Sequence, residues 1–200
     1  MRSLSGYVGC ILLLATFLAC QKSEYHQLVK RELASGERHD TLFLNMTFGM
    51  SRDSFFAHCF KLNRQGLVHQ GMKNNSVEYP LQDTLPKGVA RLNFYPEFHD
   101  GKLYRMPVSF RYDAWAPWKT DMQVDSMLPD VLALLEEWHG GEFIPFGTPE
   151  TGRGWVKVDG NRRILVTKED IQRVKFTYQD LSVDAPPVPV RPKGFPNAQQ

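Results

Sequence analysis

The chain has 200 residues, of which 42% are hydrophobic and 12% aromatic, enough for one globular domain with an apolar core. Its formal net charge is only +2 at pH 7, so it has no extended basic field of the kind that recruits nucleic acid. We therefore expect a single folded domain and no nucleic-acid partner.

Residues 1–19 have the features of an export signal. Arg2 precedes an apolar run that extends from Val8 to Ala19. About a dozen apolar residues suit the hydrophobic region of a signal peptide, whereas a membrane-spanning helix needs roughly 20. We expect residues 1–19 to be removed. The alternative is an amino-terminal transmembrane anchor without lipid.

Cys20 is the predicted site of lipid attachment. The run Phe17-Leu18-Ala19-Cys20 resembles the lipobox of bacterial lipoproteins, in which diacylglycerol is attached to the cysteine before cleavage. Lipoboxes prefer Leu where this chain has Phe17, but Phe17 suits an ordinary signal peptidase even less. Because Gln21 is not Asp, the resemblance implies anchoring to the outer membrane through lipid on Cys20.

The other two cysteines agree with this interpretation. Cys10 leaves with the signal, so Cys59 is the one thiol that remains besides Cys20. A lone thiol in an oxidising compartment is expected to be buried.

The first half of the chain predicts one helix among several strands. Residues 20–40 are polar and read as a tether with a short helix before Gly36. A helix is expected from Ser51 to Gly66, because its apolar residues recur on one face. That face comprises Phe55, Phe56, Cys59, Phe60 and Leu62. Alternating or apolar runs predict strands at 42–48, 67–72, 77–81, 89–95 and 104–112, with Asp100-Gly101 as a hairpin turn.

The second half repeats this order. A loop at 113–119 precedes a helix with an apolar face from Leu128 to Trp138, and capping by Asp125 or Ser126 would place Pro129 in its first turn. Strands are expected at 143–146, 155–158, 162–167 and 174–178, with Asp159-Gly160 as a turn. The Pro-rich residues 183–200 are predicted to be a disordered tail.

These elements predict an α+β fold in which two helices pack on one face of an antiparallel sheet. One domain should cover residues 41–182. Because a helix, strands, an Asp-Gly turn and an aromatic strand occur in both 51–112 and 126–181, the sequence also suggests a duplicated α-β-β-β unit.

No motif for catalysis, metal binding or cofactor binding is present. The histidines are spread along the chain, which argues against a metal or catalytic cluster, although folding could bring some together; they are His26, His39, His58, His69, His99 and His139. Glu97, His99 and Asp100 could serve acid/base chemistry, but Asp100 is better explained as the turn residue. We expect no metal, no cofactor and no enzymatic activity.

An aromatic cluster between the two halves is a candidate binding site. Tyr112, Trp115 and Trp118 surround the loop at 113–119. Such rings stack on sugars or anchor protein partners. The alternative is that they fill the seam between the halves.

A second candidate surface lies on the polar sides of the two closing strands. Its residues are Arg105, Arg111, Arg173 and Lys175. If these strands are neighbours, the side chains form a basic stripe that could meet an acidic partner or lipid headgroups. The alternative is a solvated sheet face.

Two short motifs resemble the SmpA/OmlA-type outer-membrane assembly lipoproteins. They are Phe48-Gly49-Met50-Ser51-Arg52-Asp53, which opens the first helix, and Asp100-Gly101-Lys102-Leu103. The resemblance implies a periplasm-facing binding module. More broadly, the chain looks like lipoproteins of Bacteroidota that have no assigned activity.

The leading hypothesis is therefore a lipid-anchored, non-enzymatic module that binds an envelope protein. The second is a lipoprotein that binds a glycan or small ligand through the aromatic loop. An envelope hydrolase is the third.

Overall fold

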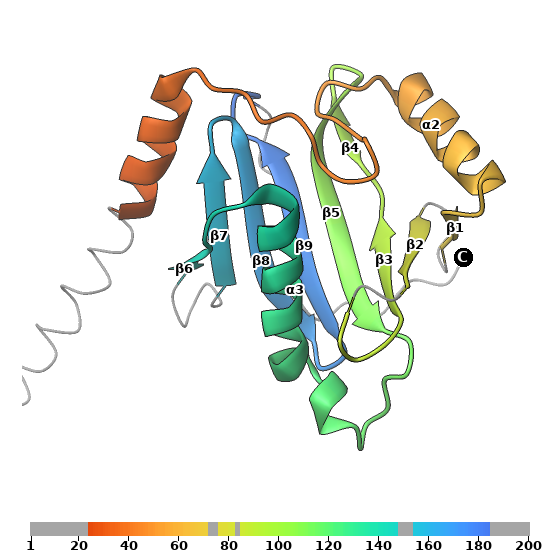
Figure 1. Ribbon diagram of the computed structural model, residues 1–200. Helices are drawn as coiled ribbons and strands as arrows, with labels where there is room; N and C mark the ends of the chain where they lie inside the picture. The colour runs from red at the N-terminus through yellow and green to blue at the C-terminus, as the bar shows by residue number, and fades with distance from the viewer. Residues whose placement is uncertain (1–23, 72–75, 83–84, 148–153, 185–200) are drawn as a thin grey trace, which may run out of the picture.

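The computed structural model describes residues 24–71, 76–82, 85–147 and 154–184, which form an α+β fold with a nine-stranded antiparallel sheet (Figure 1). A helix over residues 24–35 comes first. The elements that follow are α2 (Arg52–Arg64), β1 (His69–Gln70), β2 (Val77–Leu81), β3 (Ala90–Phe94), β4 (Glu97–His99), β5 (Lys102–Tyr112), the short 3₁₀ helix η1 (Thr120–Met122), α3 (Val124–His139), β6 (Ile144–Phe146), β7 (Gly154–Asp159), β8 (Arg162–Asp170) and β9 (Arg173–Asp180).

The sheet consists of two meanders that meet at its centre. The strand order is β1-β2-β3-β5-β9-β8-β7-β6, with β4 paired to β5 outside this path. In each half a helix precedes the strands, and the last strand of each half, β5 or β9, lies at the central seam. The predicted fold class is confirmed, and its two halves follow the same plan.

Helix α2 forms where the sequence predicts it. Ser51 is the N-cap, because its side chain accepts a hydrogen bond from the Ser54 amide. Phe55, Cys59 and Leu62 are buried. The chain leaves the helix through Gly66, whose φ of +72° suits glycine.

Helix α3 begins earlier than predicted. It starts at Val124, so neither Asp125 nor Ser126 is the cap, and Gln123 occupies that position without a side-chain hydrogen bond. Ser126 instead donates its hydroxyl to the Thr120 carbonyl (3.0 Å). Pro129 therefore lies in the second turn of the helix, where its ring removes one backbone donor.

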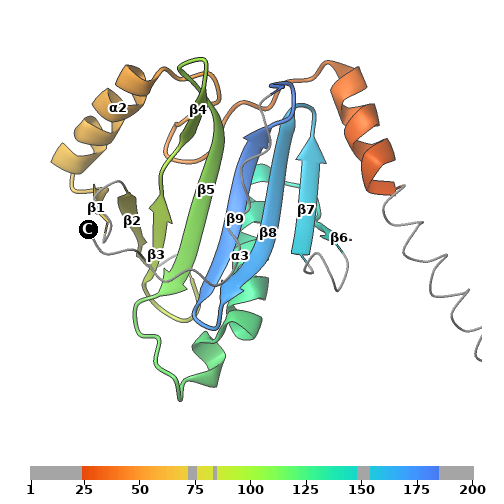
Figure 2. The ribbon, with the colours of Figure 1, turned by 180° about the vertical axis from the view of Figure 1, so that it is seen from behind.

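The core lies between the helices and one face of the sheet. Alternate residues of β5, Met106, Val108 and Phe110, point into it beside Phe176 and Tyr178 of β9. The intervening residues form the opposite face, and in the view from behind no described helix lies across its central strands β5 and β9 (Figure 2). Next to them on β8, Arg163 of this face donates to the hydroxyl of Tyr25 in the N-terminal helix (2.8 Å). This alternation is what an antiparallel sheet with one solvated face requires.

The strand predicted at 42–48 is wrong. Leu44 and Asn45 both have positive φ (50° and 58°), and this reverses the chain so that the Leu42 amide donates to the Met46 carbonyl (2.8 Å). Most of its apolar residues are nevertheless buried, because the loop places Leu42, Phe43, Met46 and Phe48 in the core. Leu44 is partly buried against that core.

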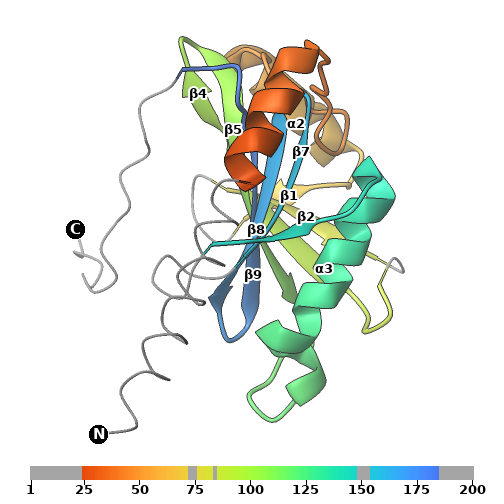
Figure 3. The same ribbon diagram turned by 90° about the vertical axis from the view of Figure 1, so that its left-hand side faces the viewer.

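Residues 24–40 are not a free tether. The expected helix before Gly36 is present, but it docks on the domain near β7 (Figure 3). The rings of Tyr25 and Phe146 lie 4.6 Å apart, and Glu32 accepts a hydrogen bond from the Gly160 amide (3.2 Å). Arg38 then pairs with the buried Asp180 (3.2 Å).

Several sequence predictions fall outside the described residues. These are the signal at 1–19, the lipid site Cys20 and the tail from 185 onward. Among the described residues no helix is both long and apolar enough to span a bilayer.

Candidate functional site

The aromatic cluster at the loop is only partly exposed. Tyr112 lies in the core, and its hydroxyl donates to Asp130 on α3 (2.8 Å). Trp115 is partly buried against the core. Trp118 is 80% exposed. The loop thus offers one free ring to a ligand, so the three rings do not form the stacking platform that the glycan hypothesis needs.

Tyr112 has a structural role. Lys87 donates to the same Asp130 carboxylate (2.6 Å) and to the Ser126 carbonyl (2.6 Å), which links the loop before β3 to α3. Burial and the neighbouring carboxylate both raise the pKa of the Tyr112 hydroxyl. The tyrosine therefore remains neutral and holds α3 against β5.

The two closing strands, β5 and β9, are neighbours, which was the condition for the predicted basic stripe. In the register of β5 and β9, Arg105 lies opposite Gln179 and Ser109 opposite Lys175. All four of these residues share the face that the helices leave open. Arg111 and Arg173 alternate onto the same face.

The arginines on this face are held by acidic partners. Arg105 donates to Glu97 (2.5 Å), and Arg173 donates to Asp170 (2.5 Å). Arg111 lies 3.8 Å from Asp113, which also accepts from Arg91 (2.5 Å). The surface therefore alternates in charge along the strands instead of forming a net basic stripe.

Lys175 differs from these arginines. Within the described residues its ammonium group has no hydrogen-bond or ion-pair partner. Across the strand, Ser109 donates its hydroxyl to Glu169 (2.6 Å). We define the open sheet face by Arg105, Ser109, Arg111, Lys175 and Gln179.

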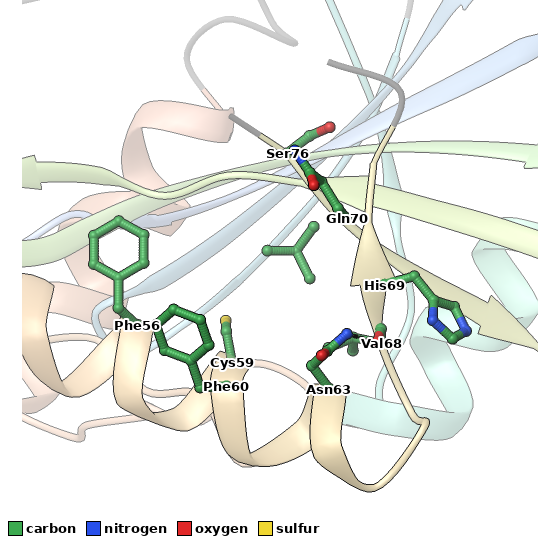
Figure 4. Close-up of a pocket in the computed structure, with 9 residues that line it drawn as sticks. Phe56, Cys59, Phe60, Asn63, Val68, His69, Gln70 and Ser76 are labelled. Carbon is green, nitrogen blue, oxygen red and sulfur yellow. Dashed lines mark hydrogen bonds between the residues drawn. The ribbon is translucent and has the colours of Figure 1, made fainter. Parts of the chain in front are cut away.

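A separate groove of about 360 Å³ lies at the first edge of the sheet, between α2 and the residues of β1 and β2 (Figure 4). Phe56 and Phe60 line it and are 37% and 69% exposed. The apolar helix face found in the sequence is therefore only partly buried, at Phe55, Cys59 and Leu62. The helical spacing of apolar residues predicted the apolar stripe of α2 correctly. However, β1 is too short to cover the full width of that stripe.

A buried polar network ties α3 to the second half of the sheet. His139 contacts the Tyr178 hydroxyl through Nε2 (2.8 Å) and Arg162 through Nδ1 (3.0 Å). Since Arg162 can only donate, Nδ1 is the acceptor and Nε2 carries the hydrogen. Asp159 receives bonds from both Arg162 (2.6 Å) and Lys157 (2.5 Å).

This network favours a neutral imidazole. Burial lowers the pKa of His139 to about 3, and the Arg162 guanidinium acts in the same direction. The pKa of Asp159 is lowered despite the cost of its burial, since Arg162 and Lys157 donate to its carboxylate. Neither Asp159 nor Arg162 was identified as important from the sequence, where Asp159 was interpreted as a turn residue.

The other acid/base candidates that the sequence offered are engaged in local contacts. Among the described residues no three His, Cys, Asp or Glu side chains are placed to hold a metal ion. His58 bonds the Leu44 carbonyl (2.7 Å). Glu97 is engaged by Arg105, and Asp100 takes the turn conformation with φ of 47°.

Comparison of the chain with known protein families, with curated proteins and with solved structures finds no match.

Proposed function

We propose that the protein is a non-enzymatic, protein-binding module that lipid on Cys20 anchors to the outer membrane, and that its partner, another envelope protein, binds the open sheet face. The observation that carries this proposal is a broad sheet face on which most charged side chains are already fixed by neighbours.

Preorganisation is what makes such a face suitable for binding. A long side chain that is free in solution loses about 0.5–1.5 kcal/mol of conformational freedom when a partner immobilises it. Arg105 and Arg173 have already lost most of this freedom to Glu97 and Asp170. A partner can therefore accept their remaining N–H groups at lower entropic cost.

Lys175 supplies the charge that a partner can pair with. It stands near the centre of the sheet, on β9, and its ammonium group is uncommitted among the described residues. We expect a carboxylate of the partner opposite Lys175. The other charges on the open sheet face are nearly balanced. This face therefore distinguishes between partners by where their charged groups lie, more than by long-range attraction.

Site-specific photocrosslinking in native cells tests the binding surface. A photoreactive residue at Lys175 or Thr167 should give the same crosslinked protein, because both positions lie on the open face. The matched control at Ala133, on the exposed side of α3, should not give it. Crosslinks confined to the chain itself, or equal yield at Ala133, would contradict the proposal.

Fractionation tests the anchor separately. Cys20→Ser should leave the protein in the soluble fraction or leave its signal uncut, since position 20 then has no thiol for lipid attachment. A Cys10→Ser variant is the control and should fractionate like the original chain. If processed Cys20→Ser protein stays in the membrane fraction, the lipid anchor is wrong.

A further inference from the structure

We propose that the groove between α2 and β1 is a second binding site, which takes an extended segment of another protein that carries apolar residues beside acidic ones. This site lies at the edge of the sheet and does not depend on the open sheet face or on lipid at Cys20.

The groove is apolar where a side chain would enter it. Phe56, Cys59 and Phe60 form one wall on α2, and Gln70 and Ser76 lie across the cavity from them (Figure 4). Val77 also lines the cavity. Asn63 fixes the loop at the end of the helix, because its amide donates to the Val68 carbonyl (2.8 Å). This bond ties the last turn of α2 to the residue before β1, at one end of the cavity.

The exposure of this wall marks it as unusual for the molecule. Seven large hydrophobic residues are exposed among those described, and three of them, Phe56, Phe60 and Leu67, belong to α2 and the residues just after it. Single exposed hydrophobics are ordinary, whereas neighbouring ones beside a cavity favour association. An apolar side chain in the groove would remove these rings from water.

The adjacent strand can hold the main chain of such a segment. β1 is the first strand of the sheet and pairs only with β2 within the described residues, and both His69 and Gln70 are exposed. The outward N–H and C=O groups of an edge strand pair readily with an extended peptide. Because β1 is only two residues long, side chains in the groove must supply most of the affinity.

Charge decides which segment fits. The exposed side of α2 carries the cations Lys61 and Arg64, and neither has an ion-pair partner among the described residues. Asp53 is the acidic residue on the same helix. This excess of positive charge favours acidic residues beside the apolar anchor.

The same positive charges disfavour two other occupants of the groove, which are the C-terminal segment of this chain and a second copy of it. Residues 185–200 of this chain contain Arg191 and Lys193 but no Asp or Glu. A second copy that used the same groove would bring the cations of two α2 helices together. The occupant that complements the surface is therefore an acidic segment of a different protein.

Cys59 contributes packing to this site. Burial raises the pKa of its thiol to about 11, so it stays protonated and unreactive near neutral pH. Its sulfur faces the groove in Figure 4 and forms an apolar part of the wall.

Selection of displayed random dodecapeptides against the purified full chain tests the proposal. Enriched peptides should combine apolar residues with Asp or Glu, and they should bind Phe60→Ser at least tenfold more weakly. Arg64→Glu should weaken them about threefold or more. Trp118→Ser is the matched control, since it also removes an exposed aromatic ring, and it should stay within twofold.

Amide chemical shifts locate the bound peptide. An enriched peptide should perturb His69 and Gln70 of β1 more than Lys175 of the open sheet face. Failure to enrich any peptide, enrichment of basic peptides, or equal binding by Phe60→Ser would each overturn the proposal. Because Phe60 is largely exposed, its replacement leaves the folded core intact, which circular dichroism checks.

Discussion

The two ends of the sheet share one plan but are finished differently. At the β6 end, the helix of residues 24–35 docks on the domain, and a buried network of His139, Arg162 and Asp159 locks α3 to the strands. At the β1 end, α2 stands over a two-residue edge strand and leaves Phe56 and Phe60 in contact with solvent.

This difference shows how a repeated architecture can divide its tasks. Polar side chains at a covered end of the sheet must form hydrogen bonds and ion pairs with one another, as those of Lys157, Asp159 and Arg162 do. Leaving an edge open keeps apolar surface available to another molecule. We therefore expect substitutions at the closed end to change stability, and those at the open end to change binding.

The largest effect should come from opening the closed end. Arg162→Ala removes the donor to Asp159, to His139 and to the Thr41 carbonyl, and leaves the half-buried Asp159 with the Lys157 ammonium alone. We expect a loss of about 3 kcal/mol in the free energy of unfolding, measured by urea denaturation. The exposed Arg31→Ala should cost less than about 0.5 kcal/mol. Similar losses for both would mean that the network adds no stability.

Acidification should weaken the same end. His139 has an ordinary pKa of 6.5 when unfolded and about 3 when folded, so below pH 6.5 the unfolded chain takes up a proton that the folded protein does not. Stability should fall by about 1–2 kcal/mol between pH 7 and pH 5. His139→Gln should flatten this part of a pH-dependent denaturation series. An unchanged slope in the variant would assign the effect to other groups.

The docking of the N-terminal segment can be separated from simple backbone strain. At Gly160 an added Cβ would lie 2.4 Å from the Glu37 carbonyl oxygen, whereas at Gly36 it would meet nothing within 4 Å. Both residues have positive φ, so alanine at either position costs about 1–2 kcal/mol. Gly160→Ala should cost about 1 kcal/mol more and speed hydrogen exchange of residues 37–40. Equal behaviour of the two variants would show that the segment is only loosely held.

The smallest effect on stability is expected at the open end. Phe60→Ser removes a ring that is already 69% exposed. The free energy of unfolding, measured by thermal denaturation, should therefore change by no more than about 0.5 kcal/mol. Phe55→Ser, on the buried face of the same helix, should cost several kcal/mol. A large loss for Phe60→Ser would mean that the groove is part of the core and would remove the contrast between the two ends.

The fold class followed from hydrophobic periodicity because both helices and most strands have one buried face. The Asp100-Gly101 turn was also predictable, since both residues adopt the positive φ that this dipeptide favours. The loop at 42–48 was not, because its apolar residues alternate like those of a strand, and this pattern outweighed the tolerance of Asn45 for positive φ.

The candidate surfaces were harder to predict, because exposure depends on which elements become neighbours. The sequence predicted a basic stripe only if β5 and β9 were neighbours, which they are. The acidic partners of Arg105 and Arg173 could be identified only from the folded structure. The groove could not be predicted from the sequence. Periodicity identifies the apolar face of α2 but does not show how much of that face the sheet covers.

Docking of the N-terminal helix also limits how far the domain can stand from a bilayer. Four Cα steps separate Cys20 from the first described residue, Glu24, and they span at most about 15 Å. If Cys20 carries lipid, the β6 end is therefore kept near the headgroups while α2, at the far end of the sheet in Figure 1, extends into the aqueous compartment. The anchor would then orient the protein as well as retain it.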